Sequence, residues 1–556
     1  MKRIFQLIPT SFRRRGIGVL CSILVQALLD FVGLAVLLPV IILVTDPEAV
    51  TTNGYLSQLW AWGGFTSART FTLAVCGVVV CVIAIKGLLG MWLWRGQNRF
   101  VMGLYRHYSK RLFAHYHNRG LLFIKSHNSA KLAHEINFVC LAFVVNVLMT
   151  LAALTTEVVL MTLMTVALLI YNAKVAGLLI AILVPVVALY FRFVRGRIGD
   201  YGKRENEIRR NQNRLVVESL VGYSEIEVAG VFSEMEHRFD RGIREIAEQR
   251  LQIGTLSQVP SIILDLCIAV ALAVLVTFRA DAVAFGIFAV AAVKILPTAK
   301  GIVARWITLR NNMYTADIVT QTQESSNECA EQKSERMTFE REISLNDVSF
   351  RFPDGDTDVL EHLSLQVRKG ETIGIKGVSG GGKTTLFNLL LGFYPPTEGS
   401  VTIDGVELNA QNLRAWHNIV GYVPQNVFVM DSTIAENVSM GAPEADRTRI
   451  EDAVRRASLW EWVESLPEGL DTKIGEAGCR LSGGQKQRLG IARALYKRAE
   501  VLFFDEATSA LDSDTEREIT SSLEALSRFE GELTIFIIAH RTSSLTFCDR
   551  IVEIKS

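Results

Sequence analysis

The sequence predicts a multi-domain membrane protein in which a transmembrane domain of six helices precedes an α/β domain. Of its 556 residues, 49% are hydrophobic, and the mean hydropathy of +0.27 is high for a soluble protein. Long apolar blocks dominate up to about residue 315, whereas the chain after about residue 340 has the character of a soluble α/β domain. We therefore expect a transmembrane domain at 1–316, a linker at 317–340 and the α/β domain at 341–556.

Six apolar stretches are long enough to cross a bilayer, which takes about 20 apolar residues in a helix. They are residues 17–45, 71–95, 137–171, 175–196, 255–278 and 282–304. The alternative, buried core helices of a soluble protein, does not fit their number and length. The pattern indicates a multi-pass protein embedded in a lipid bilayer.

The distribution of charge predicts the orientation of these spans. Segment 97–136 is rich in Lys and Arg, and segment 197–254 carries many charges of both signs, whereas the other connections are short and poor in basic residues. Because basic loops stay in the cytoplasm, both termini should be cytoplasmic, in a protein of the cell (inner) membrane. The basic segment 1–15 lacks the pattern of a signal peptide and is expected to form a short amphipathic helix on the membrane surface.

Among the charged residues within apolar spans, Lys86, Lys294 and Asp265 stand out. A charge in the bilayer is costly, so such residues usually face a partner or a water-filled path. One interpretation is a cavity in which the two lysines attract an anionic group of a substrate. The other is that the lysines reach toward the interface, or that a Lys–Asp pair only holds helices together.

Net charge and cysteine spacing argue against a nucleic-acid partner and against sites made of cysteine. The net charge of +1 gives no sign of a nucleic-acid partner. The eight cysteines are scattered without C-x-x-C spacing, so we expect neither a disulfide framework nor a cysteine metal site.

A glycine-rich loop, Gly377–Thr384, fits the pattern G-x-x-x-x-G-K-[ST] that surrounds the phosphates of ATP or GTP. It follows a short apolar strand, Thr372–Ile375, and opens a helix, Lys383–Leu391, which is the context that this motif requires. Backbone N–H groups of the loop and of the helix N-terminus face the phosphates. We expect Lys383 to contact the β/γ-phosphates and the Thr384 hydroxyl to bind Mg²⁺.

An apolar strand, Val501–Phe504, ends in two acids about 120 residues after the loop. At such a strand end Asp505 can hold Mg²⁺, directly or through water. The next residue, Glu506, is the expected general base that orients the attacking water.

A second glycine motif, Leu481–Gln485, precedes another helix, so Ser482 and two glycines form a second helix N-terminus with free N–H groups. Together the two motifs resemble the ATP-binding-cassette (ABC) family, and with six spans before them they resemble an exporter-type half-transporter over the whole chain. The resemblance implies that Leu481–Gln485 caps the ATP held by a second ATPase domain. The chain then works as a dimer, most simply a homodimer, with a heterodimer as the alternative.

The resemblance assigns further roles residue by residue. It implies that Phe352 stacks on adenine, although a core Phe is the alternative. Gln425 senses Mg²⁺ and water, and His540 contacts the γ-phosphate. Segment Ser509–Asp512 communicates across the dimer, and Glu476 contacts the transmembrane half.

The complete set of expected site residues divides by role. Those expected to bind the nucleotide are Phe352, Gly377, Ser379, Gly380, Gly381, Gly382, Lys383, Thr384, Thr385, Ser482, Gly483, Gly484, Gln485 and Asp505. The expected catalytic residues are Glu506, His540 and Gln425, and the expected Mg²⁺ ligands are Thr384, Gln425 and Asp505. ATP and Mg²⁺ are thus the expected cofactors.

The resemblance also implies ATP-driven export by alternating access, with short coupling helices near Leu121–Leu132 and Val221–Gly230. The chain looks most like bacterial flippases of polyprenyl-diphosphate-linked oligosaccharides, through the external segment Asn53–Trp62, Lys86 and the turn Lys294–Pro297. Export of a peptide, a drug or another lipid is the alternative. A membrane ABC ATPase that regulates or forms a channel, without transporting, is a third possibility.

Overall fold

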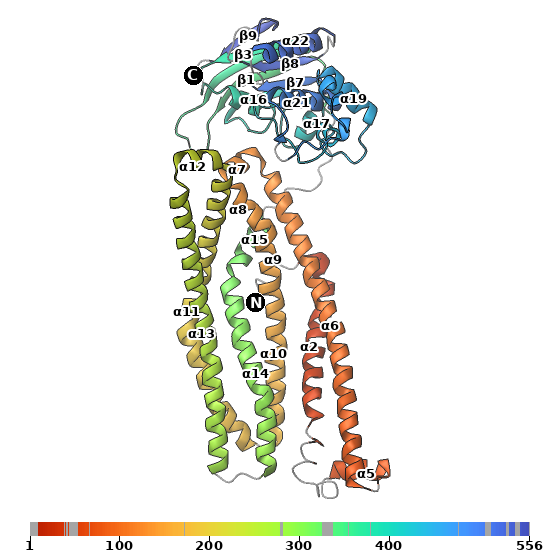
Figure 1. Ribbon diagram of the computed structural model, residues 1–556, viewed down its shortest axis with the longest axis vertical. Coiled ribbons are helices and arrows are strands. Elements are labelled where there is room, and N and C mark those ends of the chain that lie inside the picture. Colours follow the sequence, from red (N-terminus) through yellow and green to blue (C-terminus); the bar gives the residue numbers. More distant parts are fainter. Residues whose placement is uncertain are drawn as a thin grey trace. The chain divides into compact units, whose positions relative to one another are not determined.

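A computed structural model of the chain divides into two compact units (Figure 1). It describes residues 9–37, 39–40, 43, 54–65, 67–171, 173–277, 282–324, 337–353, 355–378, 380–475, 478–505, 513–529, 533–539 and 545–554. The first unit consists of Met1–Arg119 and Phe123–Glu328, and the second of Gly120–Leu122 and Cys329–Ser556.

The first unit consists of long helices. They are α2 (Thr10–Ala35), α6 (Ala68–Asn118), α10 (Thr150–Tyr171), α11 (Ala173–Val221), α13 (Phe232–Thr277) and α14 (Ala282–Asn312). Before α10 the chain is already helical through α8 (Ser129–His134), η1 (Glu135–Val139), α9 (Cys140–Ala142) and η2 (Phe143–Met149), of which η1 and η2 are π-helical turns. Helices α2 and α6 lie side by side, as do α11 and α13, and α10 and α14 (Figure 1).

Helices of this unit cover most of the described residues of the six expected spans. Within the part of the chain that the structure describes, four segments are long and apolar enough to cross a membrane: Thr10–Ala35, Arg69–Asn118, Ser129–Ile170 and Phe232–Val270. The expected spans 175–196 and 282–304 are helical in α11 and α14, but most of their side chains lie outside the described residues. The helical transmembrane domain of the predicted fold class is therefore confirmed.

Short helices occupy the two segments expected to couple the domains. They are α7 (Gly120–Ser126) with α8 in the first segment, and α12 (Tyr223–Ala229) in the second. The turn that ends α12 needs a left-handed backbone, and Gly230 supplies it at φ 64°. A third short helix, α5 (Gly54–Gly63), lies in the expected external segment, where Trp60 packs on Phe71 with ring centroids 5.3 Å apart.

The expected linker begins later than the sequence suggested. Helix α15 (Tyr314–Glu324) covers its first residues and belongs to the first unit, which extends to Glu328. Ala316 and Val319 are buried in a core that also contains Leu104 and Leu112 of α6 and Phe143 of η2. Two apolar residues one turn apart are thus enough to dock this 11-residue helix, which the polar composition of the segment does not reveal.

The second unit contains an antiparallel and a parallel sheet. The antiparallel sheet has the order β2-β1-β4-β5 and the parallel sheet the order β6-β7-β8-β3-β9. The first sheet comprises β1 (Glu342–Phe350), β2 (Leu360–Arg368), β4 (Glu398–Ile403) and β5 (Val406–Glu407). The second comprises β3 (Thr372–Gly377), β6 (Val420–Val423), β7 (Val501–Asp505), β8 (Thr534–Ile538) and β9 (Arg550–Ile554).

Helices and aromatic side chains complete this unit. The helices are α16 (Lys383–Leu390), α17 (Leu413–Ile419), α18 (Ile434–Val438), α19 (Arg447–Arg456), α20 (Trp460–Glu464), α21 (Gly483–Lys497) and α22 (Ser513–Phe529). Strands β7 and β8 are buried along their length and β3 over its first four residues, as expected where parallel strands are covered on both faces. Phe503 stacks on Phe536 at 4.7 Å, and Phe387 of α16 packs edge-on against Phe503, which fixes the P-loop helix on the strands.

Candidate nucleotide-binding site

The P-loop lies where the sequence predicts it, between the end of β3 and the start of α16. Gly380 and Gly382 have φ of 82° and 85°, in the left-handed region that side chains disfavour. A Cβ atom on Gly382 would also lie 2.9 Å from Leu360 Cδ2 and 3.0 Å from the Val359 carbonyl oxygen. Glycine is thus required at 382 by both the backbone conformation and the neighbouring strand.

Lys383 opens α16 and is 5% exposed. Its Nζ donates hydrogen bonds of 3.0 Å to the carbonyl oxygens of Gly377 and Val378, which hold the ammonium group inside the loop. These two acceptors are neutral, so the positive charge of Lys383 is not cancelled by them. The loop therefore presents a fixed cation together with the N–H groups of a helix N-terminus, a combination that suits phosphate.

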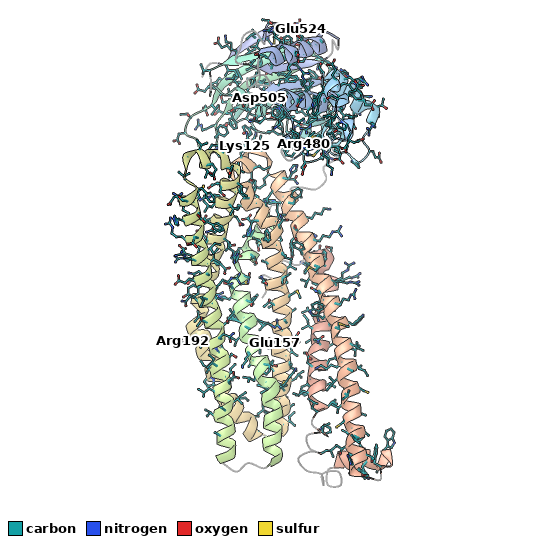
Figure 2. All side chains as sticks on the ribbon, viewed as in Figure 1. Lys125, Glu157, Arg192, Arg480, Asp505 and Glu524 are labelled. Atoms are coloured by element: carbon teal, nitrogen blue, oxygen red, sulfur yellow. The ribbon has the colours of Figure 1, made fainter. Side chains whose placement is uncertain are left out.

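Thr384 and Asp505, 121 positions apart in the sequence, meet below this loop. The Thr384 hydroxyl donates to Asp505 Oδ1 over 3.4 Å, and Asp505 is 5% exposed at the end of β7 (Figure 2). Hydroxyl and carboxylate oxygens are ligands that Mg²⁺ prefers. The residues present thus fit the expected Mg²⁺ ion.

Tyr422 is a neighbour of this pair to which the sequence assigned no role. Its hydroxyl donates to Asp505 Oδ2 over 3.5 Å. Burial, and then the charge of Asp505, raise the pKa of Tyr422, so the phenol stays protonated and remains a donor. Its position in the parallel strand β6, beside Phe503 of β7, brings it close to Asp505, and single-residue patterns do not reveal that register.

Phe352 lies two residues beyond the end of β1 and is 38% exposed. It packs edge-on against Phe350 and Tyr394, with ring centroids 5.1 Å and 5.9 Å away. A ring held on one side and open on the other suits stacking against a flat ligand better than a core position. Its role in binding adenine stays a prediction.

The second glycine motif forms a capped helix N-terminus. The Ser482 side chain accepts a hydrogen bond from Gln485 N at 3.2 Å, and the Gln485 side chain accepts one from Ser482 N at 2.8 Å. This capping box fixes the start of α21. Ser482 and Gly483 are exposed, so they are accessible to a ligand or to another chain.

Helix α21 is also joined to the segment that follows β6. Gln487, 6% exposed, donates to the Gln425 carbonyl oxygen over 2.8 Å, and Arg493 donates to the Phe428 carbonyl oxygen over 2.5 Å and to Asn437 Oδ1 over 2.8 Å. Burial lowers the pKa of Arg493 to about 10, and the residue stays charged near neutral pH. These buried polar contacts were not predicted.

Several expected site residues lie outside the described residues. They are Ser379, Glu476, Glu506, His540 and the segment Ser509–Asp512. The roles that the sequence assigns to them stay predictions.

The charged residues of the spans have partners on neighbouring helices. Lys86 Nζ of α6 lies 2.8 Å from Asp30 Oδ1 of α2, and Lys300 Nζ of α14 lies 2.7 Å from Asp265 Oδ1 of α13. The alternative of Lys–Asp pairs between helices thus has named partners for Lys86 and for Asp265. Among the described residues, Lys294 forms no such pair.

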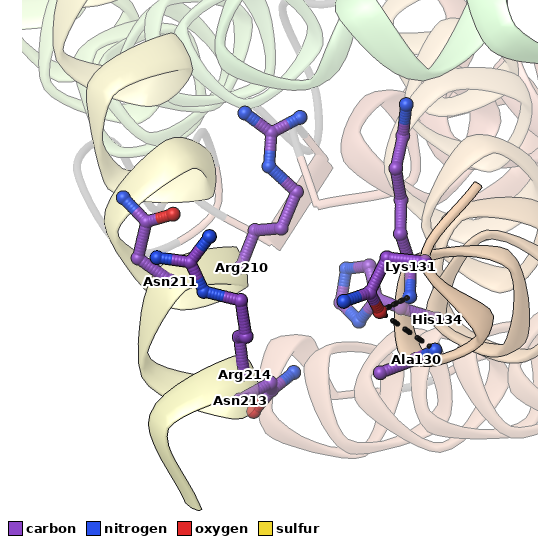
Figure 3. Close-up of a pocket in the computed structure, with 8 residues that line it drawn as sticks. Ala130, Lys131, His134, Arg210, Asn211, Asn213 and Arg214 are labelled. Carbon is purple, nitrogen blue, oxygen red and sulfur yellow. Dashed lines mark hydrogen bonds between the residues drawn. The ribbon is translucent and has the colours of Figure 1, made fainter. Parts of the chain in front are cut away.

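Two further features belong to this helical unit. Arg305 of α14 pairs with Glu157 of α10 at 2.9 Å, a further ion pair between helices. Glu157 is labelled in Figure 2. A separate polar pocket of about 230 Å³ lies between α8 and α11, where Lys131 and His134 face Arg210 and Arg214 (Figure 3). Each cation of the pocket other than His134 has a carboxylate of its own helix within 4.0 Å: Glu135, Glu207 and Glu218, respectively.

The long apolar helices, the P-loop and the acidic strand end define a membrane-bound nucleotide-binding protein with the exporter fold. A sequence model described as ABC transporter matches residues 360–509. The fold is similar to a solved bacterial Atm1-family ABC exporter with ATP bound, with a TM-score of 0.79 and 24% identity over 98% of this chain and 94% of that chain.

Similar curated proteins include three named ATP-dependent lipid A-core flippase. That of Bordetella avium is 34% identical over 70% of this chain and 67% of its own length. Those of Chromobacterium violaceum and Burkholderia pseudomallei are 33% and 36% identical, over 67% and 68% of this chain and 65% and 64% of their own length. The chain thus spans about two thirds of these relatives. It belongs to the ABC transporter family and has the fold of an exporter half-transporter.

Proposed function

We propose that the chain hydrolyses ATP as one half of a homodimeric flippase, and that it moves a negatively charged amphiphilic lipid across the membrane. The observation that carries the ATPase part is the convergence of Thr384 and Asp505 beneath a P-loop whose lysine is already in place. The long apolar helices that precede this site support transport as its purpose.

In this proposal each residue of the site has a defined task. Lys383 and the loop N–H groups hold the phosphates, while Thr384 and Asp505 hold Mg²⁺, which neutralises charge on the phosphate oxygens. Glu506 accepts the proton of the attacking water, and His540 and Gln425 position the γ-phosphate and that water. Tyr422 keeps the Asp505 carboxylate oriented through its hydroxyl.

The dimer follows from the exposed start of α21. Ser482 and Gly483 offer helix N–H groups to the ATP of a partner chain, so each nucleotide lies between two chains. ATP favours the closed dimer through its higher affinity for that state, and hydrolysis releases it. The short helices α7 and α12 transmit this closure to the spans, with the ATPase unit and both termini in the cytoplasm and the spans in the inner membrane.

The class of substrate rests on two independent supports. The relatives named lipid A-core flippases favour a lipid as the transported molecule. Lys294, with no ion pair among the described residues, favours an anionic group on it. A polyprenyl-diphosphate-linked oligosaccharide, as the sequence suggested, and a lipid A-type glycolipid both have this chemistry.

A proteoliposome panel tests the proposal. The purified full-length protein is assayed for ATPase stimulation and for translocation of a polyprenyl-diphosphate sugar, a lipid A-type glycolipid, a zwitterionic phospholipid and a peptide. We expect one or both anionic glycolipids to stimulate hydrolysis and to be moved. Transport of the peptide alone would favour the alternative exporter, and hydrolysis without any transport would favour a non-transporting ATPase.

The two lysines are tested by substitution within this assay. We expect Lys294→Ala to lower translocation of the anionic lipid about tenfold, which is the size of one charge-assisted hydrogen bond. Lys86→Ala should lower it as well, but that variant also leaves Asp30 without its partner in the membrane.

The pair variant Lys86→Ala/Asp30→Ala separates the two effects on Lys86. If Lys86 contacts the lipid, translocation stays low in the pair variant, whereas recovery would mean that the pair only holds α2 to α6. Lys300→Ala/Asp265→Ala, which removes a similar pair, is the matched control and should transport normally. Unchanged translocation in both Lys294→Ala and Lys86→Ala would refute the hypothesis that these lysines attract the anionic group of the substrate.

A further inference from the structure

A groove of about 480 Å³ lies between α2 and α6 of the first unit, and none of the ion-paired residues of the spans lines it. Its polar lining consists of Arg15 and Ser22 from α2 and Arg95, Gln97 and Arg99 from α6, with Trp92 at its side. The proposed function uses none of these residues.

The three arginines of the groove give it an uncompensated positive charge. Within the described part of the chain, none of their guanidinium groups forms a hydrogen bond or an ion pair, and no carboxylate lines the groove. The basic pocket of Figure 3 differs, because three of its cations have carboxylates within 4.0 Å. Of these two sites, the groove is therefore the one in which no carboxylate of the chain neutralises the basic side chains.

The groove lies at the depth of a membrane interface. Arg15 stands at the start of the first apolar span, and Arg95 and Arg99 stand where the apolar part of α6 gives way to its polar extension. Trp92 and Trp94 are 72% and 54% exposed at the same level, and tryptophan concentrates where hydrocarbon meets headgroups. Leu20 and Leu89 of the same helices are exposed apolar side chains, as expected of helix surfaces in contact with lipid.

Small residues keep the groove open toward the lipid. A Cβ atom on Gly18 or on Gly96 would meet no atom within 4 Å. Among the described residues of the groove, Gln97 Nε2 donates to Ser22 Oγ over 3.1 Å, and Ser22 Oγ donates to the Val19 carbonyl oxygen over 2.7 Å. Both contacts are neutral; the first joins the two helices, and neither uses a guanidinium group.

We propose that this groove binds the phosphate of an anionic phospholipid from the leaflet at this end of the spans, as a bound lipid that is not transported. Guanidinium groups form paired hydrogen bonds with phosphate oxygens, and Trp92 packs against the glycerol and upper acyl chain. A free phosphate ion would use the arginines alike but would gain nothing from the exposed tryptophan and the apolar walls. Basic pockets between spans on the cytoplasmic side bind anionic headgroups by this physics.

Native mass spectrometry of the detergent-purified full-length protein, without nucleotide, tests the proposal. Phosphatidylglycerol, phosphatidylcholine and soluble glycerol phosphate are titrated separately. The test variant is Arg95→Gln/Arg99→Gln, and the control is Arg106→Gln/Lys110→Gln, which removes the same charge from the same helix beyond the groove. We expect tight phosphatidylglycerol binding that weakens about 30-fold in the test variant and less than twofold in the control.

Several results would overturn the assignment. If the affinity for phosphatidylglycerol fell equally in the two variants, the effect would be one of overall charge. If the affinity did not fall in the test variant, Arg95 and Arg99 would not bind the lipid. Competition by glycerol phosphate at the concentration of the lipid would identify a free-phosphate site instead. Arg95→Lys/Arg99→Lys, which keeps the charge, should retain binding at least fivefold above the Gln variant, so a fold defect cannot imitate the result. Because the assay uses neither ATP nor the transported substrate, its failure would leave the proposed flippase function standing.

Discussion

Glu506→Gln is expected to lower the maximal ATPase rate at least a hundredfold while ATP binding survives. The amide keeps the size and the hydrogen-bonding reach of the side chain but cannot accept the proton of the attacking water, and general-base catalysis contributes about 10²–10⁴-fold. The measurement is the steady-state rate of phosphate release by the full-length protein in proteoliposomes, with nucleotide affinity measured in parallel.

The matched control is Glu524→Gln on α22, which makes the same chemical change elsewhere in the same unit. Its ATPase rate should stay within twofold of the unsubstituted protein. Hydrolysis at a normal rate in Glu506→Gln would remove this residue from catalysis. A loss of ATP binding along with the rate would point to a structural defect rather than to the missing base.

Complementation between two inactive chains is the second result with a large expected effect. Lys383→Ala removes the phosphate-binding cation, and Ser482→Arg blocks the exposed start of α21 with a bulky charge. Each variant alone should lose ATPase activity more than a hundredfold. When both are produced together with different tags and purified as mixed dimers, one site should be complete, because the normal P-loop of one chain faces the normal Ser482 of the other.

The mixed dimer should therefore trap one nucleotide where each parent dimer traps none. Mixing after purification, without exchange of chains, is the control and should give no recovery. If each nucleotide were bound within a single chain, both sites of the mixed dimer would be defective and no nucleotide would be trapped. That outcome would contradict the shared site and the homodimer that follows from it.

Features that depend on residues close together in the sequence were predicted well, whereas contacts between distant residues were not. The loop geometry around Gly382 and Lys383 was predictable because a turn, a helix start and a cation occupy adjacent positions. The φ of 85° at Gly382 is the left-handed conformation that this turn needs. The helices of the spans were predictable because about 20 consecutive apolar residues leave few other structures. Short stretches of sequence are therefore sufficient to predict the phosphate-binding loop and the membrane-spanning helices.

Contacts across elements were harder to predict. A Lys–Asp pair between helices was one of the alternatives for Lys86, but the sequence did not identify Asp30 of α2, 2.8 Å away, as its partner. Gly33 of α2 leaves the space that the lysine stem occupies. The partner of Asp265 is Lys300, at a position that the sequence did not single out. Such pairs depend on the rotation of one helix against another, which periodicity does not determine.

The bonds from α21 to the segment after β6 have a consequence for timing in the proposed dimer. In that dimer the start of α21 would bind the ATP of the partner, whereas Gln425, whose carbonyl oxygen accepts a hydrogen bond from Gln487, would act on the ATP of its own chain. When the γ-phosphate leaves the site that contains Gln425, a shift of Gln425 would move α21 through this hydrogen bond. The start of α21 closes the second nucleotide site of the dimer. ATP hydrolysis would then alternate between the two sites of the dimer instead of occurring at each site independently.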